Sequence, residues 1–359
     1  MALYGISDPT HHKTPRTMPN AQPGIVRSIA ESLRLIRPRK PHPMEQFHDL
    51  MRHVRDHGIR QVNQRTGEVV RFIPGCMLKF DMADGFPAIT TKQLFFKAAK
   101  GELIGFFRGY QSAAQFREIG CKVWDVNANI TPAWLENPNR QGVDDCGRIY
   151  GAQWTDWRDW REAEGAVARD SLLAKGYEIR AHDQTTDLYV MRRGLNQLEE
   201  ALKKVMTNPT DRGILVNGWR PDEFDIQCLR PCHVSYTLVC DVPSNTLHLS
   251  FYQRSWDMAL AFNITLGALF LHIFARLAGM KPGSVSHHVA DAHLYESHLP
   301  GVETMLARDH FEQPTLDLGP IPTLTSVDQI PGVFERIDPD LIKLVNYKHH
   351  PAVKFAMTA

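Results

Sequence analysis

Residues 258–280, MALAFNITLGALFLHIFARLAGM, are the most apolar stretch of the chain and constrain its fold more than any other segment. The polar or charged side chains of Asn263, Thr265, His272 and Arg276 interrupt it. A membrane span needs about 20 predominantly apolar residues with few or no charges, so these interruptions argue against one. A helix that is apolar nearly all round belongs in a protein core. The sequence therefore predicts that other elements enclose this helix.

The segments around this helix have the β-branched, alternating character of strands. The runs at 233–242 and 246–255 are joined by the short turn PSN and are expected to form a hairpin. A further β-rich run lies at 213–219, and residues 69–82 are expected to form two short strands around Pro74–Gly75. We expect these strands to lie in one sheet.

Three other segments have the apolar period of amphipathic helices. They are MEQFHDLMRHVRDHG, which ends at Gly58, KAAKGELIGFFRG, which ends at Gly109, and LNQLEEALKKVMTNPTDRG, which is stopped by Asn208–Pro209. Strands in one sheet with helices packed against it define the α+β class, which is the predicted fold class of this chain.

Residues 1–43 differ from the rest of the chain. They begin with a loose arm rich in Pro, His and Thr, followed at 25–41 by a short basic amphipathic helix. This helix is either an organelle-targeting element or a helix docked on the protein. Residues 44–359 are expected to form a single domain, with the charged segment near 161–187 as a surface insertion.

The composition excludes several classes of protein. Lys and Arg number 41 against 40 for Asp and Glu, so no basic excess points to nucleic acid as a substrate. The chain shows no secretory signal and no CxxC pair, and the sequence therefore predicts a cytoplasmic protein with reduced thiols and no metal. Its cysteines are Cys76, Cys121, Cys146, Cys228, Cys232 and Cys240.

Cys232 lies in the segment LRPCHVSYTL, and YQRSWD follows at 252–257 at the end of the next strand. If the two strands pair, Arg254 lies near Cys232, and a guanidinium close to a thiol favours the nucleophilic thiolate. A buried, inert cysteine is an equally good interpretation of this spacing. His233 is a poor candidate for the base of a cysteine hydrolase, because neighbouring residues of a strand point to opposite faces.

Several motifs together resemble the thymidylate synthase family. They are LRPCHVSYTL, YQRSWDMALAFNI, VADAHLYESH and NYKHHPAVKFAMTA, preceded by QRTG, DGFPAITTKQ, GELIGFFRG, VWDVNAN and IYGAQW. The resemblance runs from about residue 44 to the C-terminus, except near 161–187. It implies a mixed sheet covered by helices, with the sheet packed against its partner in a homodimer.

By this resemblance the chain converts dUMP to dTMP. The co-substrate is 5,10-methylenetetrahydrofolate, which supplies the carbon and the hydride, and no membrane partner is implied. Because C5 of uracil is a poor nucleophile, a thiolate must first add to C6, and the resemblance assigns that step to Cys232. The alternative is a nucleotide hydroxymethylase, in which water replaces the hydride and the product is 5-hydroxymethyl-dUMP. Asn263 favours uracil over cytosine as the base for either reaction.

The resemblance also assigns a nucleotide site. Asn263 corresponds to the amide that reads uracil, because a carboxamide can donate to O4 and accept from N3–H. His293 and Tyr295 correspond to the pair that bonds the ribose hydroxyl. The implied phosphate ligands are Arg65, Arg254, Ser255 and, from the second subunit, Arg212.

The remaining roles concern proton transfer and the folate. Glu102 resembles the carboxylate that organises proton transfers, and Tyr150 the tyrosine beside the catalytic cysteine. The implied folate-pocket residues are Lys92, Trp124, Asp257 and Ala359, the last in a tail that closes over the ligands. Singly, these residues have simpler interpretations: a surface charge for Glu102, core aromatics for Trp124 and Tyr150, and a helix cap for Asp257.

Two departures from the family pattern affect these assignments. The family usually has adjacent arginines where this chain has Arg212–Gly213, so one phosphate charge is missing. The segment MALAF between Asp257 and Asn263 is two residues shorter than usual. A changed pocket that admits water would favour the hydroxymethylase. A non-catalytic regulator is disfavoured, because a pure binder needs no nucleophile.

Overall fold

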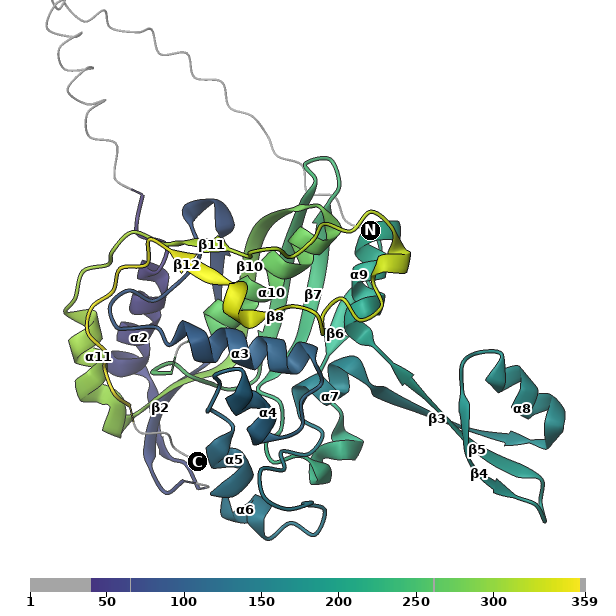
Figure 1. Cartoon of the computed structure of the whole chain (residues 1–359). Coiled ribbons are helices and arrows are strands. Elements are labelled where there is room, and N and C mark those ends of the chain that lie inside the picture. The colour runs from purple at the N-terminus through teal and green to yellow at the C-terminus, as the bar shows by residue number, and fades with distance from the viewer. Residues whose placement is uncertain (1–39, 65, 261, 356–359) are drawn as a thin grey trace, which may run out of the picture. The chain divides into compact units, whose positions relative to one another are not determined.

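The structure is a computed structural model that describes residues 40–64, 66–260 and 262–355 (Figure 1). Within these residues the principal sheet has seven strands in the order β1–β2–β10–β8–β7–β6, with β9 paired to β10. These strands are β1 (Ile59–Val62), β2 (Val69–Asp81), β6 (Leu215–Asn217), β7 (His233–Asp241), β8 (Thr246–Gln253), β9 (Trp256–Asp257) and β10 (Lys281–Tyr295). β10 is antiparallel to β2 and parallel to β8, so the sheet is mixed.

The apolar helix is enclosed as predicted, but it begins later than the apolar run does. α10 (Asn263–Ala278) packs against β8 and β10 on one side and α3 (Phe96–Phe107) on the other. It ends at Gly279, whose φ of 68° is the left-handed cap expected of glycine. Residues 258–260 form a turn instead of helix, and the Asp257 carboxylate accepts the Ala259 N–H at 3.0 Å within it. Asp257 therefore does not cap α10.

The other helices surround this centre. α2 ends at Gly58 as expected, although Gly58 is extended, with φ −61°. A side chain there would place its Cβ 2.3 Å from the Val54 carbonyl oxygen, which is why glycine is required. The helices are α2 (Glu45–His57), α4 (Ala113–Glu118), α5 (Asp125–Asn129), α6 (Pro132–Leu135), α7 (Tyr150–Thr155), α9 (Gln197–Thr207) and α11 (Leu299–Leu306). The 3-10 helices are η1 (Met82–Asp84), η2 (Pro221–Ile226), η3 (Glu296–His298), η4 (Val327–Gln329) and η5 (Pro339–Leu341).

One strand prediction was wrong. Residues 69–81 form one continuous strand, β2, instead of two short strands around Pro74–Gly75. The pairing register with β10 is the same on both sides, since Pro74 faces Asp291 and Cys76 faces Val289. Gly75 takes a φ of 67°, which glycine adopts without strain, so the strand continues through the dipeptide in one register.

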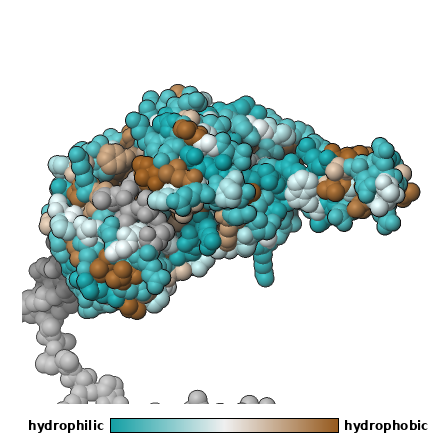
Figure 2. All heavy atoms as spheres, turned by 90° about the horizontal axis from the view of Figure 1, so that it is seen from below, coloured by the Kyte–Doolittle hydropathy of each residue, from teal (hydrophilic) through white to brown (hydrophobic). Residues whose placement is uncertain are grey.

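The α+β class is confirmed, but the strands do not all lie in one sheet. A three-stranded sheet, β3–β5–β4, carries α8 and has a small apolar core of its own around Tyr177 and Met191. Its elements are β3 (Trp157–Glu164), α8 (Gly165–Leu173), β4 (Glu178–Asp183) and β5 (Leu188–Leu195), so the charged segment 161–187 lies within it. Figure 2 shows apolar side chains among hydrophilic ones on this part of the surface, where Trp160 and Val167 are exposed.

A third sheet pairs β11 (Thr315–Asp317) with β12 (Lys343–Val345) near the C-terminus. No helix in the described ranges is long and apolar enough to cross a membrane. The predicted basic helix at 25–41 lies outside the described residues, apart from its last two positions.

Candidate active site

Cys232 lies where two cavities of about 690 and 660 Å³ adjoin, just before β7. The first, which we call the polar lobe, is lined mainly by polar atoms, and the second, the apolar lobe, mainly by apolar atoms. Their common lining residues are Asn127, Leu229, Cys232, Leu260, Phe262 and Asn263. A molecule in either lobe can therefore reach the Cys232 thiol and the Asn263 carboxamide.

Arg254 lies beside Cys232 because β7 and β8 form the predicted hairpin. His233 pairs with Gln253, and the Arg254 backbone N–H donates to the Cys232 carbonyl at 2.9 Å. The guanidinium donates to the carbonyl oxygens of Pro231 and Arg230 at 2.9 and 3.0 Å, which fixes it next to the thiol segment. This anchoring leaves Nη1 without a hydrogen bond to the described residues, and Arg254 and Ser255 both line the polar lobe.

The far end of β10 supplies the other wall of the polar lobe. His293 and Tyr295 alternate along this strand and both line the cavity, with their ring centres 5.6 Å apart. The His293 Nδ1 lies 3.0 Å from the Asp291 carboxylate, which orients the imidazole. Asp257 lines the same lobe, and its carboxylate lies 3.6 Å from Nδ1 of His298.

Glu102 is a buried carboxyl group in the apolar lobe and not the surface charge that its helix position allowed. It lies on α3 and is 8% exposed. Burial raises the pKa of its carboxyl group to about 8, although the Trp124 indole acts to lower this pKa. At neutral pH the group is mostly protonated, so it can donate a proton inside the cavity as well as accept one.

Tyr150 connects the apolar lobe with Cys232. The Cys232 backbone N–H donates to the Tyr150 hydroxyl at 2.5 Å, and burial raises the pKa of this phenol well above its usual value. The ring stacks on Phe106 at 4.7 Å and meets Trp124 edge to face at 5.8 Å. Tyr150 and Trp124 are thus core aromatics and cavity walls at the same time.

Lys92 contacts both the segment between Asp257 and Asn263 and the C-terminal tail. Its ammonium donates to the Ala259 carbonyl at 2.7 Å and lies 4.6 Å from the centre of the Phe355 ring. Burial lowers the pKa of Lys92 to about 8, while the charge of Asp257 opposes the shift. Val353 and Phe355 line the apolar lobe together with Lys92.

The tail is seated against α11 at Gly301. A Cβ atom at this position would lie 2.5 Å from the Phe355 ring and 2.9 Å from a Val353 methyl group. We expect Gly301→Ala to raise the KM for the ligand of the apolar lobe several-fold, because the tail must shift. Alanine favours helix by about 0.5–1 kcal/mol over glycine, so the melting temperature should not fall. An unchanged KM would contradict this prediction. So would an equal loss of affinity for the ligand of the polar lobe, because the tail does not line that lobe.

One predicted site residue is not brought to the cavities, and two lie outside the described residues. Arg212 is exposed and lines neither lobe of its own chain. Arg65 and Ala359 lie outside the described residues. At the position of the missing second arginine, Gly213 is held by Lys204, whose ammonium donates to the Gly213 carbonyl at 3.2 Å.

Several lining residues were not identified from the sequence as site residues. Asn127, Leu229 and Phe262 line both lobes, and Asp291 orients His293. Each lies in or beside a motif that supported the family resemblance, so proximity to those motifs was the available signal. The sequence pattern alone does not show which of their side chains face a cavity.

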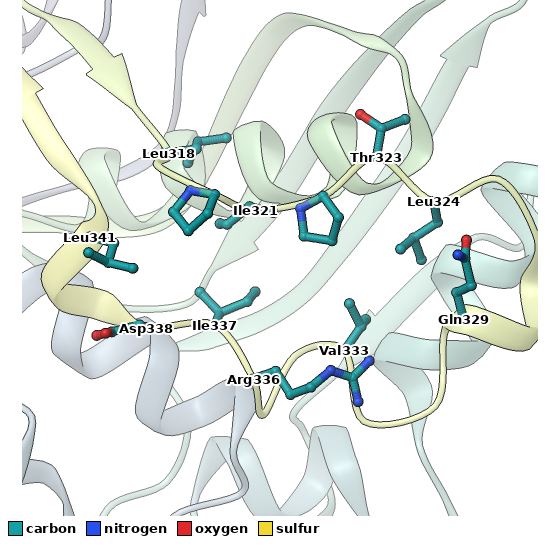
Figure 3. A pocket seen from close by; sticks show the side chains of 12 residues that line it. Leu318, Ile321, Thr323, Leu324, Gln329, Val333, Arg336, Ile337, Asp338 and Leu341 are labelled. Atoms are coloured by element: carbon teal, nitrogen blue, oxygen red, sulfur yellow. The ribbon is translucent and has the colours of Figure 1, made fainter.

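Another cavity, of about 380 Å³, lies between the segment 318–324 and the segment 329–341 (Figure 3). Leu318, Ile321 and Val333 give it an apolar lining, and Arg336 and Asp338 lie at its edge. None of the predicted site residues lines it. It therefore plays no part in the candidate active site.

A thiol at the junction of a polar and an apolar cavity, with a buried carboxyl group in the wall of the apolar one, suits an enzyme that takes two different ligands. Comparison with known proteins is consistent with this class and narrows it. Residues 45–359 match the family model described as thymidylate synthase, and the chain belongs to the thymidylate synthase family.

Bacterial relatives support this membership. A thymidylate synthase of Pseudomonas syringae pv. tomato is 39% identical over 323 residues, which cover 88% of this chain and 99% of the relative. One from Bordetella parapertussis is 40% identical over 317 residues, covering 86% and 97% of the two chains. One from Haemophilus influenzae is 34% identical over 317 residues, covering 87% and 99%.

Proposed function

We propose that this protein is a thymidylate synthase that converts dUMP and 5,10-methylenetetrahydrofolate to dTMP and dihydrofolate. The observation that carries the proposal is the position of Cys232 at the junction of the two lobes. A nucleotide in the polar lobe and a folate in the apolar lobe would meet at this thiol. The names of the relatives and the family membership support the same activity.

The polar lobe has the chemistry that a pyrimidine nucleotide requires. Arg254 and Ser255 would bind the phosphate, and His293 and Tyr295 the ribose hydroxyl. The Asn263 carboxamide makes no hydrogen bond within the described residues, so its donor and its acceptor are both available to uracil O4 and N3–H. Arg65 would add a phosphate contact.

Cys232 would begin the reaction by adding its sulfur to C6 of uracil. The addition breaks the C5–C6 double bond and leaves an enolate whose negative charge is shared by C5 and O4, so C5 becomes nucleophilic. Arg254 next to the thiol favours the thiolate that attacks. Tyr150 holds the Cys232 backbone, which positions the sulfur relative to the base.

Glu102 would manage the protons on the other side of the base. With a pKa of about 8, the buried carboxyl group can donate a proton toward O4 as charge develops there and take it back later. The final steps remove the C5 proton and restore the Cys232 thiolate. A carboxyl group whose pKa lies near neutrality suits both directions of transfer.

The apolar lobe fits a folate. Trp124, Phe106 and Phe355 provide aromatic surface for a flat heterocycle, and Lys92 provides a polar contact. Asp257 lines the polar lobe and would reach a folate only across the junction. Bound there, the co-substrate supplies the one-carbon unit and the hydride. The tail segment Val353–Phe355, continuing to Ala359, would cover it and exclude water.

We further propose that the protein works as a homodimer in which Arg212 enters the partner's polar lobe. One face of the principal sheet packs on α10, whereas the opposite face exposes Met77, Val239 and Tyr252. Met77 and Tyr252 both pair with His288 of β10, and Val239 pairs with His248, which lies four residues before Tyr252 on β8. Because side chains alternate between the two faces of a strand, these three side chains lie on the same face. An exposed apolar face of this kind marks an interaction site.

The six cysteines, none in a disulfide, favour a reducing compartment such as the cytoplasm.

One incubation tests the proposed reaction. The protein is mixed with dUMP and 5,10-methylenetetrahydrofolate, and the products are identified by mass. We expect dTMP and dihydrofolate in equal amounts. Formation of 5-hydroxymethyl-dUMP and tetrahydrofolate instead would show that water, and not hydride, completes the reaction, and would replace the proposed activity with a hydroxymethylase. The same incubation with dCMP should give no product, because Asn263 is suited to uracil.

A further inference from the structure

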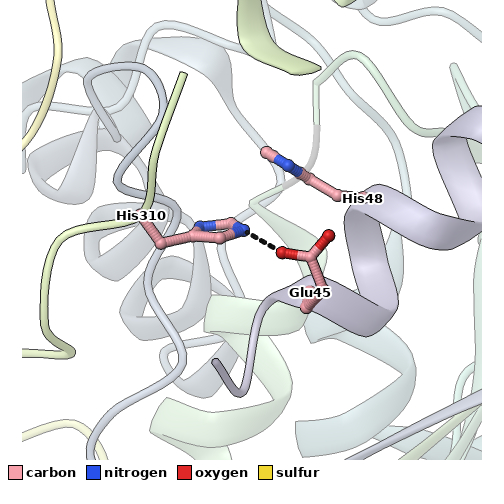
Figure 4. Close-up of side chains that lie close together, drawn as sticks. All are labelled: Glu45, His48 and His310. Atoms are coloured by element: carbon pink, nitrogen blue, oxygen red, sulfur yellow. Dashed lines mark ion pairs between the residues drawn. The ribbon is translucent and has the colours of Figure 1, made fainter. Parts of the chain in front are cut away.

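A second cluster of titratable side chains lies outside the active site, at the start of α2. Glu45 and His48 are one helical turn apart, and His310 comes from the segment after α11 (Figure 4). One potential metal-ligand atom from each side chain lies within 4.8 Å of the other two. Two imidazoles and one carboxylate from separate parts of the chain therefore lie close enough together to share one ion.

His310 is the residue that needs an explanation. Its side chain is 8% exposed, and neither ring nitrogen makes a hydrogen bond within the described residues. Nε2 lies 3.3 Å from Oε2 of Glu45, but not in hydrogen-bond geometry. Burial lowers the pKa of both His48 and His310 to about 4, so at neutral pH both rings are uncharged, the form that binds metals. A buried imidazole with no partner is costly unless something binds it.

The two neighbouring polar side chains, His42 and Arg52, do not take up the atoms that would bind an ion. His42 stacks on His310 at 4.3 Å, but its Nε2 lies 2.9 Å from the Phe311 carbonyl and its Nδ1 accepts the Met44 N–H at 3.2 Å. His42 is therefore a neighbour and not a ligand. Arg52 donates to Oε1 of Glu45 at 2.8 Å. The other carboxylate oxygen, Oε2, faces His310 and can bind an ion.

The spacing suits a small divalent ion. Tetrahedral Zn²⁺ with bonds of about 2.0–2.1 Å to nitrogen and oxygen places its ligand atoms about 3.3 Å apart. The Glu45–His310 separation of 3.3 Å already has this value, and the remaining ligand atom needs a side-chain movement of no more than about 1.5 Å. Glu45, with its side chain 34% exposed, gives an ion access from solvent.

We propose that Glu45 Oε2, His48 and His310 bind one Zn²⁺ or a similar divalent transition-metal ion per chain, with solvent completing the tetrahedron. The site was not apparent from the sequence, because no metal-binding spacing connects α2 with residue 310, and the sequence led us to expect no metal. The ligand set of two histidines and one glutamate is one that zinc accepts in proteins. The proposal is independent of the reaction at Cys232.

The surroundings assign the ion a structural role near the tail. Nε2 of His48 lies 3.0 Å from the Thr91 hydroxyl, the type of second contact that orients a metal-bound imidazole. The Thr91 carbonyl accepts from Arg308 at 2.7 Å, and the Thr90 carbonyl accepts the His350 N–H at 2.8 Å. An ion held by α2 and His310 would therefore fasten the segments on which the C-terminal residues rest.

The test measures metal binding and stability rather than activity. The full-length protein is stripped with a chelator, dialysed against Zn²⁺ or Co²⁺, and analysed for bound metal, for cobalt absorption bands and for melting temperature. We expect one ion per chain, a visible Co²⁺ spectrum typical of tetrahedral coordination, and a rise in melting temperature of about 2–4 °C with excess Zn²⁺.

The variants separate this site from other metal ligands. Glu45→Gln and His310→Gln should each abolish the bound ion, the cobalt bands and the thermal shift, and two independent variants guard against one that fails to fold. His53→Gln, an exposed histidine of the same helix, and Cys232→Ser should retain all three. The proposal is overturned if no ion binds at about 0.1 mM Zn²⁺, a concentration well above the dissociation constants of structural zinc sites. It is also overturned if Glu45→Gln and His310→Gln both still bind the ion, or if Cys232→Ser loses the ion.

Discussion

Replacing Cys232 with serine is expected to lower kcat by about 10⁴-fold or more. A thiol is a far stronger acid than a serine hydroxyl, and its thiolate is the better nucleophile. Serine at this position would therefore be a poor replacement for the thiol beside Arg254. The measurement is the rate of dTMP formation at saturating substrates. Cys240→Ser is the matched control, because Cys240 lies on β7, the strand that begins directly after Cys232, and lines neither lobe.

A trapped adduct gives this prediction a second readout. A dUMP analogue with fluorine at C5 cannot lose a C5 proton, so the sulfur–C6 bond should persist and add the mass of the nucleotide and the one-carbon folate to the chain. Cys240→Ser should show the added mass, and Cys232→Ser should not. An undiminished rate in Cys232→Ser would sink the covalent mechanism.

Replacing Glu102 with glutamine is expected to lower kcat by about 10²–10⁴-fold while leaving dUMP binding nearly unchanged. The amide has a similar shape but cannot transfer a proton, and Glu102 lines the apolar lobe and not the polar one. The measurement is kcat together with the dissociation constant of dUMP. A loss confined to KM would indicate that Glu102 only shapes the cavity.

Stability as a function of pH tests the burial of Glu102 separately from catalysis. Its pKa is raised from an ordinary 4.5 to about 8 in the folded chain, so between these pH values the folded state binds more protons than the unfolded state. Glu102 therefore makes the free energy of unfolding fall as pH rises from about 4.5 to 8. Glu102→Gln should remove this fall and melt higher than the parent at pH 8. Glu118→Gln, an exposed change, should not.

The sequence predicted well those parts of the fold that depend on local pattern. The hairpin of β7 and β8 and the ends of α2 and α9 follow from turn residues, apolar period and breakers that act within a few positions. The continuity of β2 through Pro74–Gly75 did not follow, because the partner that keeps the strand in register, β10, lies some 200 residues later. Likewise, the turn before α10 depends on the contact of Lys92 with the Ala259 carbonyl.

The candidate site was predicted from motifs, and its environment was not. The sequence indicated which side chains belong together, including Glu102 and Tyr150, but not that burial raises the pKa of both groups. Burial is a property of everything packed around a residue, and no spacing along the chain encodes it. The histidine at 310 is the clearest case, since its partners on α2 are neighbours only in the folded molecule.

The junction of the two lobes has a consequence for refolding. Its walls come from α5, from the residues just before β7 and from the start of α10, and the apolar lobe also needs Val353–Phe355. These segments lie far apart along the sequence, so the lobes require contacts of long sequence separation, which form late because loop closure is costly. During refolding from denaturant, we therefore expect enzyme activity to return later than the secondary structure.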